Sequence, residues 1–280
     1  METGQKTTQK SSKIEQNKDK LLSIQVSLNG LSFCILDKDI NTIVFYKSFL
    51  FEKKLNPGDV LDRLTHQFNT ESALKQSFKN VSVVHDNELS SLVPKPLFNE
   101  EFLADYLKFN SKILRSDYIT YDQMQANDAV NVYVPYVNIN NFLYDKFGEF
   151  EFKHFSTIVI ENILSIEKNS IKNKMYVHLS DHHFEIVIVE NGQLRLYNTF
   201  EFSTKEDFIY YILFTAEQLE MNPEEFPIEI IGNIDENNEL FQITYKYVRD
   251  VSIHIPNTKL ELADELEIKC LQDFVILNSF

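Results

Sequence analysis

The sequence predicts an α/β protein of two lobes, in which each lobe repeats one unit of three strands, a helix and a fourth strand. Three observations support this fold class. A hexapeptide recurs as YKSFLF at 46–51 and YNTFEF at 197–202, with an offset of 151 residues. The segments before the two copies both alternate in the manner of strands and are rich in β-branched and aromatic residues. The elements that follow the two copies come in the same order.

Each hexapeptide ends a segment that reads as three consecutive strands, over 23–51 in the first copy and 175–202 in the second. In the second copy, Asn191-Gly192 stands between two apolar runs, which predicts a type I′ hairpin because both central residues need a positive φ. The first copy has a longer turn at 37–41.

Phe49 and Phe200 hold the same place in the two hexapeptides, so strand alternation predicts that they occupy equivalent, inward-facing positions.

A helix and a short strand are expected after each copy. The helices are predicted at 57–69 and 205–220, and the strands at 81–84 and 228–231. One face of the second helix carries an apolar stripe, made of Phe208, Ile212, Thr215, Ala216 and Leu219. Five elements that agree in order, spacing and class predict two ribonuclease-H-like halves.

The domain boundaries follow from this repeat. The first half is expected over 21–170, with an inserted segment at about 88–154, and the second half over 171–280. Residues 1–20 contain one aliphatic residue, Ile14, and no apolar core of a signal peptide. We expect them to form a disordered tail.

The inserted segment begins with a loop at Pro94 and Pro96, because neither residue can donate a hydrogen bond to a strand ladder. The four-residue spacing of the aromatic residues that follow predicts a packed helix with the stripe Phe98, Phe102 and Tyr106. A strand at 130–136 and a helix near 139–147 come next. The chain closes with a second helical stripe, made of Leu271, Phe274, Val275 and Leu277.

Composition excludes several classes of function. The chain of 280 residues has a net charge of -15, and residues 21–280 alone carry 22 basic and 39 acidic groups, a net charge of -17. Such an acidic body opposes nucleic-acid binding, which depends on Lys and Arg at phosphates. No window approaches the roughly 18 apolar residues of a membrane span. We therefore expect a cytoplasmic protein without membrane insertion. Cys34 and Cys270 are expected to be reduced core residues.

Two hairpins about 150 residues apart, joined by a strand-helix-helix stretch, resemble the actin-like ATPase superfamily. The resemblance covers 21–280 and is strongest to the pilus-assembly and secretion-platform scaffolds. The opening LLSIQVSLNGLSFCILD resembles more specifically a family of uncharacterised Bacteroidetes proteins with this fold. In active members of the superfamily that this chain resembles, each hairpin carries an Asp-x-Gly turn that binds phosphate and Mg²⁺.

The sequence departs from that pattern at both turns. The first turn offers only Ser27 and Asn29 where the acid is expected, followed by Gly30. The second reads Ser180-Asp181-His182-His183, which keeps one carboxylate but replaces the glycine with imidazoles. Phosphates need closely approached backbone N–H groups, and Mg²⁺ needs carboxylates nearby, so these departures argue against phosphate binding.

A third motif of the superfamily is a double-glycine turn that touches adenosine, and its match here is Gly232-Asn233. The favoured interpretation is a plain strand-to-helix turn, since glycine is the ordinary residue for turns.

Asp181, His182 and His183 also allow a metal site, because imidazole and carboxylate ligate zinc and iron. Adjacent strand residues point to opposite faces, so further ligands would come from elsewhere in the chain. The candidates are His85, His178 and His254. Hydrogen-bonded structural histidines are the favoured alternative.

The leading hypothesis is a non-catalytic actin-like module that binds an unknown protein partner or itself, without a cofactor. The alternative is a weak nucleotide-binding protein or ATPase that takes ATP and Mg²⁺, with Asp181 as its only metal-associated carboxylate. A metal-dependent enzyme at the histidine pair ranks third. The glycine motifs of serine hydrolases, Walker loops and dinucleotide sites are absent from the sequence.

Overall fold

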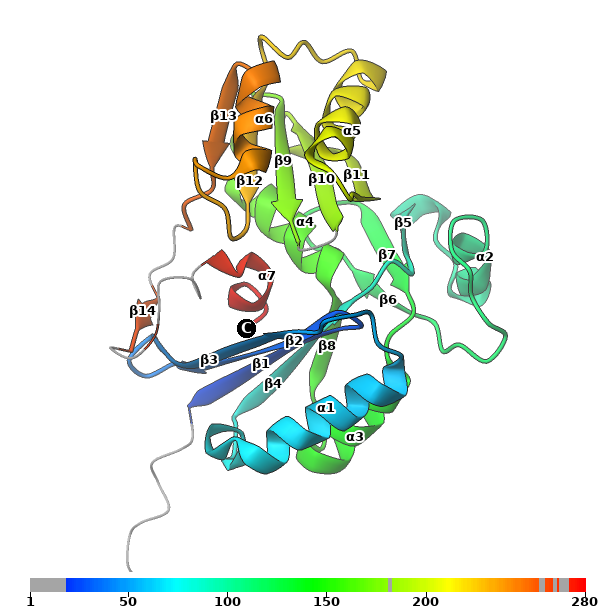
Figure 1. The fold of residues 1–280 in the computed structure, drawn as a ribbon. Helices are drawn as coiled ribbons and strands as arrows, with labels where there is room; N and C mark the ends of the chain where they lie inside the picture. Colours follow the sequence, from blue (N-terminus) through cyan, green and yellow to red (C-terminus); the bar gives the residue numbers. More distant parts are fainter. Residues whose placement is uncertain (1–18, 181–182, 257–259, 264–265, 267–271) are drawn as a thin grey trace, which may run out of the picture.

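The computed structural model describes residues 19–180, 183–256, 260–263, 266 and 272–280 (Figure 1). The expected tail, 1–20, lies outside the described residues except for Asp19 and Lys20. Cys270 and Leu271 also lie outside them. Among the described residues, none of the helices combines the length and the apolar content that a membrane span requires.

The first lobe is built on a six-stranded sheet in the order β14-β3-β2-β1-β4-β8. Strands β1, β2 and β3 form antiparallel hairpins, whereas β4 and β8 run parallel to β1. The bounds are β1 (Lys20–Ser27), β2 (Gly30–Asp37), β3 (Thr42–Leu50), β4 (Asn80–Asp86), β8 (Glu151–His154) and β14 (Glu261–Leu262).

Helices α1 (Pro57–Thr70) and α3 (Val137–Phe147) cover one face of this sheet (Figure 1). Helix α1 begins where the side chain of Asn56 accepts hydrogen bonds from two amides of the first turn. It buries the stripe Val60, Leu64 and Phe68 against the sheet. A short 3₁₀ turn, η1 (Ser72–Lys75), leads from α1 to β4.

The second lobe is built on a five-stranded sheet in the order β11-β10-β9-β12-β13. Its bounds are β9 (Lys174–Leu179), β10 (His183–Glu190), β11 (Gln193–Glu201), β12 (Pro227–Ile231) and β13 (Asp250–Ile253). Helices α5 (Lys205–Gln218) and α6 (Glu239–Tyr247) cover one face (Figure 1). Helix α5 starts with a capping box between Thr204 and Asp207.

The two sheets have the same plan. In each, an antiparallel three-stranded meander is followed by a helix, a parallel strand, a second helix and another parallel strand. The predicted fold of two ribonuclease-H-like halves is therefore confirmed. The tight turn predicted at Asn191-Gly192 is confirmed by φ values of 51° and 73°, and Asn41, in the longer turn, also has a positive φ of 52°.

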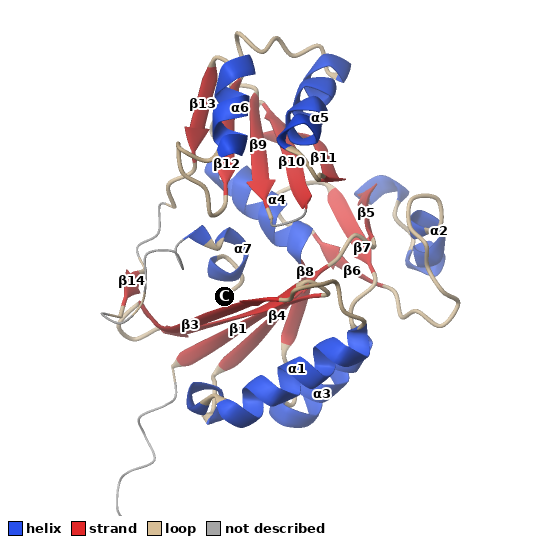
Figure 2. Ribbon diagram, in the orientation of Figure 1, coloured by secondary structure: helices blue, strands red, loops and turns tan. Residues whose placement is uncertain are grey.

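A small third sheet lies beside the two lobes (Figure 2), in the order β5-β7-β6. It comprises β5 (Ser90–Pro94), β6 (Thr120–Gln123) and β7 (Ala129–Tyr133), with the short elements η2 (Lys95–Leu97), η3 (Glu100–Phe102) and α2 (Leu103–Leu107). The predicted insertion at about 88–154 contains this sheet together with α3 and β8, which belong to the first lobe.

The packed helix predicted around Phe98, Phe102 and Tyr106 is wrong. The segment forms two 3₁₀ turns and the five-residue helix α2 instead. Pro96 stands in the first turn, and the side chain of Asn99 accepts a hydrogen bond from the N–H group of Glu101. Both features interrupt a continuous helix, so a new turn begins after each. Phe98 and Tyr106 still stack, with ring centroids 6.1 Å apart.

The last helix of each half lies between the two lobes (Figure 1). Helix α4 (Phe155–Ile166) follows the first sheet and packs on strands of the second, against side chains such as Tyr176 and Val187. Helix α7 (Phe274–Leu277) ends the second half and packs on the first sheet, where Ile276 and Leu277 belong to one buried cluster with Cys34. This exchange ties the two halves together.

Candidate ligand cleft between the lobes

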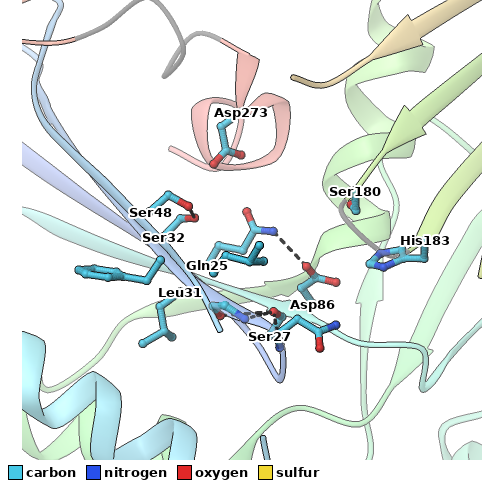
Figure 3. Close-up of a pocket in the computed structure, with 13 residues that line it drawn as sticks. Gln25, Ser27, Leu31, Ser32, Ser48, Asp86, Ser180, His183 and Asp273 are labelled. Atoms are coloured by element: carbon cyan, nitrogen blue, oxygen red, sulfur yellow. Dashed lines mark hydrogen bonds between the residues drawn. The ribbon is translucent and has the colours of Figure 1, made fainter. Parts of the chain in front are cut away.

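The turns at the ends of β1, β4 and β9 face one another between the lobes and enclose a cavity of about 180 Å³. Figure 3 shows the side chains of Gln25 and Asp86 on the first lobe, Ser180 and His183 on the second, and Asp273 at the start of α7. A second cavity, of about 500 Å³, shares Ser27, Asn29, Asp86 and His183 with the first. The β1–β2 turn therefore borders both cavities.

The amides of the β1–β2 turn are already used inside the turn. The hydroxyl oxygen of Ser27 accepts hydrogen bonds from the N–H groups of Asn29, at 3.1 Å, and Gly30, at 2.8 Å. These are the donors that a phosphate would need. With Ser27 as their acceptor, the turn offers a ligand neither these two N–H groups nor a carboxylate.

Gly30 is required by strand packing. A Cβ atom at this position would lie 2.5 Å from the carbonyl oxygen of Phe49 on β3. Only glycine allows β2 and β3 to approach this closely at Gly30. Gly30, which the resemblance to the actin-like superfamily places in a phosphate turn, is thus explained by the packing of the sheet.

Gly232 and Asn233 follow β12 and line neither cavity of the cleft. Gly232 has a φ of 133°, and a Cβ atom there would lie 2.7 Å from the carbonyl oxygen of Leu179. Asn233 is exposed. The backbone conformation and the approach to β9 account for this glycine, in keeping with the plain turn that the sequence favoured.

On the second lobe, Asp181 and His182 lie outside the described residues. The amide of Ser180 donates a hydrogen bond to the carbonyl oxygen of His183, at 2.9 Å. His183 lines both cavities.

Behind His183 lies a buried charged network centred on Glu185. Its Oε2 atom is 2.6 Å from Nδ1 of His178. Its Oε1 atom is 3.2 Å from Nε2 of His183, close enough for an ion pair but without the alignment of a hydrogen bond. Burial opposes ionisation, but the two imidazoles outweigh it and lower the pKa of Glu185 to about 2. Burial likewise disfavours the charged form of His183, yet Glu185 raises its pKa to about 9.

Two carboxyl groups that the sequence analysis did not single out also reach the cleft. Asp86 ends β4 and accepts a hydrogen bond from the amide of Gln25, at 3.1 Å. Asp273 accepts a hydrogen bond from the hydroxyl of Tyr46, at 3.0 Å. Burial raises the pKa of both carboxyl groups, although both still border the cavity. The position of Asp86 at the carboxyl end of a parallel strand was a signal that could have identified it.

The three histidines considered as further metal ligands are dispersed. His178 belongs to the Glu185 network, and His254 contacts Glu229. His85 is buried beside Asn140, with its Nε2 atom 2.9 Å from the amide oxygen, and burial lowers its pKa to about 4. Among the residues that the structure describes, no group of three or more His, Cys, Asp or Glu side chains could hold a metal ion.

The described residues of the cleft supply few of the groups that bind a magnesium nucleotide. The larger cavity is lined by Lys53, Lys54 and the imidazole of His183, and by the carboxyl groups of Glu52, Asp86, Glu88 and Glu201. These charges nearly balance, so the lining provides no strongly positive field for a polyphosphate. In the first turn, two N–H groups already donate to the hydroxyl of Ser27.

Solved structures resemble the whole fold. A protein of Bacteroides thetaiotaomicron VPI-5482, described as having an actin-like ATPase fold and unknown function, superposes with a TM-score of 0.73 at 26% identity, covering 88% of this chain and 94% of that one. A PilM-PilN type IV pilus biogenesis complex matches with a TM-score of 0.59 at 8% identity, covering 91% of this chain and 94% of that one. The second likeness shows the fold alone.

A comparison with curated proteins gave no match. The family model described as "Protein of unknown function (DUF3822)" matches residues 9–251, most of the chain. Together with the fold of the Bacteroides protein, this match confirms the predicted family of uncharacterised proteins with an actin-like fold. The chain belongs to the DUF3822 family and has the actin-like ATPase fold.

Proposed function

We propose that this chain is a non-catalytic actin-like module that acts by binding a protein partner. One observation carries the proposal: in the β1–β2 turn, the hydroxyl of Ser27 accepts the N–H groups of Asn29 and Gly30 that a phosphate would require. The chain keeps the actin-like fold, but two N–H groups of its first turn already donate hydrogen bonds to a side chain of the same turn.

The cleft is stabilised by groups of the protein itself. Hydrogen bonds within the protein line both sides of the cleft. They join Asp86 to Gln25, Asp273 to Tyr46, and Glu185 to His178. Helices α4 and α7 pack on the opposite lobes, which supports a fixed relation between the halves. A fixed two-lobed body suits a module that presents surfaces to other proteins. The fold shared with a PilM-PilN complex agrees with a protein partner as the class of ligand.

A second candidate function is weak nucleotide binding with Mg²⁺, and one observation favours it. The larger cavity, at about 500 Å³, falls within the size of ordinary ligand pockets, roughly 300 to 1,000 Å³, and Lys53 and Lys54 line it. Asp181 would then supply the only metal-associated carboxylate.

The test is recovery of the partner from native cells. The full chain with an affinity tag is cross-linked in the cell, purified, and its bound proteins are identified. Each protein found is then purified and titrated against the chain by calorimetry, with and without ATP and Mg²⁺. We expect at least one direct, saturable protein complex whose affinity does not depend on nucleotide. Absence of any direct complex, or a complex that requires ATP, contradicts the proposal.

A further inference from the structure

The smaller cavity of the cleft, of about 180 Å³, has a polar floor on the first sheet. Gln25, Ser32 and Ser48 form one row across β1, β2 and β3, because Ser32 is the strand partner of both other residues. All three residues line the cavity. The hydroxyl oxygens of Ser32 and Ser48 are 2.9 Å apart, within hydrogen-bonding distance. The floor is therefore a continuous strip of hydroxyl and amide groups.

This polar row lies on a sheet face that is apolar farther along the strands. Cys34, two residues beyond Ser32 and thus on the same face of β2, is buried in a cluster with Ile276 and Leu277 of α7. Helix α7 thus covers the apolar part of the face, whereas the polar row borders the cavity. Polar side chains next to a cavity are typical of a ligand site, because they need hydrogen-bond partners that packing does not provide.

Two carboxyl groups complete the cavity. Figure 3 shows Asp273 pointing from α7 toward the sheet, and Asp86 at the end of β4. Gln25 donates a hydrogen bond to Oδ2 of Asp86, and the hydroxyl of Tyr46 donates one to Oδ2 of Asp273. Among the described residues, none donates to Oδ1 of Asp86 or to the buried amide oxygen of Gln25. The site has more acceptors than donors, so it fits a ligand that brings donors.

The charges of the lining favour a positive ligand. No lysine or arginine is found among the described residues that line the cavity. His183 is protonated at neutral pH, but the carboxylate of Glu185, 3.2 Å from its Nε2 atom, balances that charge. Burial raises the pKa of Asp86 and Asp273, and the charge of Asp86 adds to the rise at Asp273. A cation between these carboxyl groups opposes both effects, whereas an anion reinforces them.

The volume of the cavity limits the size of the ligand. About 180 Å³ corresponds to on the order of six water molecules, at roughly 30 Å³ each. This space exceeds a single ammonium group and is smaller than ordinary ligand pockets, of roughly 300 to 1,000 Å³. Leu50 lies on the same face of β3 as Ser48, lines the cavity and is 59% exposed, so it offers an apolar contact. Two carboxyl groups beside an apolar side chain suit a short hydrocarbon chain with an ammonium group at each end.

We propose that the smaller cavity binds a small aliphatic diamine. One ammonium group donates to Asp86 and the other to Asp273. The hydroxyl oxygens of Ser32 and Ser48 accept further hydrogen bonds, and the methylene chain lies against Leu50. The inference goes beyond the proposed function, because a diamine site and a protein partner do not depend on each other.

Calorimetric titration of the full chain with putrescine, a four-carbon diamine, tests the inference. We expect one saturable site with a dissociation constant of about 1 mM or lower, and a rise of the thermal midpoint with ligand. Two compounds with the same carbon chain isolate the charges. Butylamine keeps one ammonium group, and butanediol keeps neither. Each should bind at least about tenfold more weakly than putrescine, because charge-assisted hydrogen bonds are lost.

Variants of the two carboxyl groups locate the site. Asp86→Asn and Asp273→Asn each remove a negative charge and keep an oxygen that can accept from Gln25 or Tyr46. Each should raise the dissociation constant for putrescine by at least about tenfold. Thermal unfolding checks that both variants remain folded.

Two further variants separate the cavity from the general charge of the cleft. Ser48→Leu fills the floor from an exposed position without changing the charge, and it should weaken putrescine binding by at least about tenfold as well. Glu52→Gln is the matched control, because Glu52 lines the larger cavity and not the smaller one. It should bind putrescine like the wild type.

The absence of saturable binding at about 10 mM putrescine would overturn the inference. Butanediol that binds as tightly as putrescine would do the same, since the cavity would then recognise a neutral hydroxylated ligand. So would carboxyl variants that bind like the wild type, or an equal loss in Glu52→Gln, which would indicate diffuse attraction by the acidic cleft. None of these results affects the proposed protein partner, whose complex is measured separately.

Discussion

Phe49 on β3 and Phe200 on β11 occupy the same position in the two halves of the molecule. Phe49 is the strand partner of Leu31 on β2, and Phe200 is the strand partner of Phe184 on β10. Leu31 and Phe184 are themselves equivalent, since each also pairs with the neighbouring first strand of its sheet. Both phenylalanines pack on the core of their own lobe. The equivalence predicted from the repeated hexapeptide is confirmed.

Replacing Phe49 or Phe200 with Ala should lower the free energy of unfolding by about 1.5 to 3 kcal/mol. Full burial of Phe corresponds to about 3 to 5 kcal/mol, but these rings are only half-buried. Urea denaturation measures the change. Leu50→Ala is the matched control, because Leu50 is next to Phe49, points to the other face and is 59% exposed. A silent substitution at one phenylalanine would contradict equivalent packing of the two halves.

The repeat could be predicted because its signals are local. Alternating apolar residues and the Asn191-Gly192 pair define the hairpins. Helices α1 and α5 begin at Pro57 and Lys205, as predicted from the sequence. The cleft could not be assembled in this way. Gln25, Asp86 and Asp273 are far apart in the chain, and only the folded sheets and the crossing of α7 bring them together. Neither periodicity nor a short motif encodes that convergence.

Glu185→Gln tests the buried charge network and should destabilise the protein by about 3 kcal/mol near neutral or mildly acidic pH. Removing one partner of a buried pair leaves the charge of His183 without its counter-charge. Because Glu185 raises the pKa of His183 from 6.5 to about 9, this stabilisation is complete below about pH 6.5 and is lost as the pH rises through about 9.

The wild type should therefore lose stability between about pH 6.5 and about pH 9, while Glu185→Gln should vary little over that window. Urea denaturation at both ends of the window measures the difference. The exposed His66 provides the control, since His66→Gln should leave the pH profile of the wild type unchanged. A parallel profile in Glu185→Gln would show that the pair does not stabilise the fold.

Gly30→Ala should destabilise the protein by about 1 to 3 kcal/mol, the usual range for overpacking, because the new Cβ atom would meet the carbonyl oxygen of Phe49. Gly58→Ala is the control. Gly58 lies in the first turn of α1, where an added Cβ would approach only the side chain of Asn56. Thermal unfolding of both variants checks the difference. Equal stability would show that Gly30 is not needed for strand packing.

Deleting residues 1–18 should leave the thermal midpoint nearly unchanged, because this polar segment has little apolar surface with which to offset its ordering entropy. Deleting 1–20 is the sharper comparison. It also removes Asp19, whose carboxylate is 2.7 Å from Nζ of Lys79, and Lys20, which pairs with Asp37 at the start of β1. The longer deletion should lower the midpoint. A loss of several degrees from the shorter deletion would show that the segment docks on the body.

The purified chain should not hydrolyse ATP above background, with or without Mg²⁺, and should bind it weakly if at all. Phosphoryl transfer needs backbone donors and a metal placed at the developing charge, whereas Ser27 already accepts the two amides of the first turn. His183 carries a proton at neutral pH and could attract phosphate, but the neighbouring Glu185 balances that charge. Calorimetry at about pH 6 and about pH 7.5, with a phosphate-release assay, measures both properties.

Asp181→Ala is the informative variant, since Asp181 is the one carboxylate kept from the superfamily pattern. Micromolar ATP affinity or turnover that Asp181→Ala abolishes would refute the non-catalytic proposal and establish the nucleotide alternative.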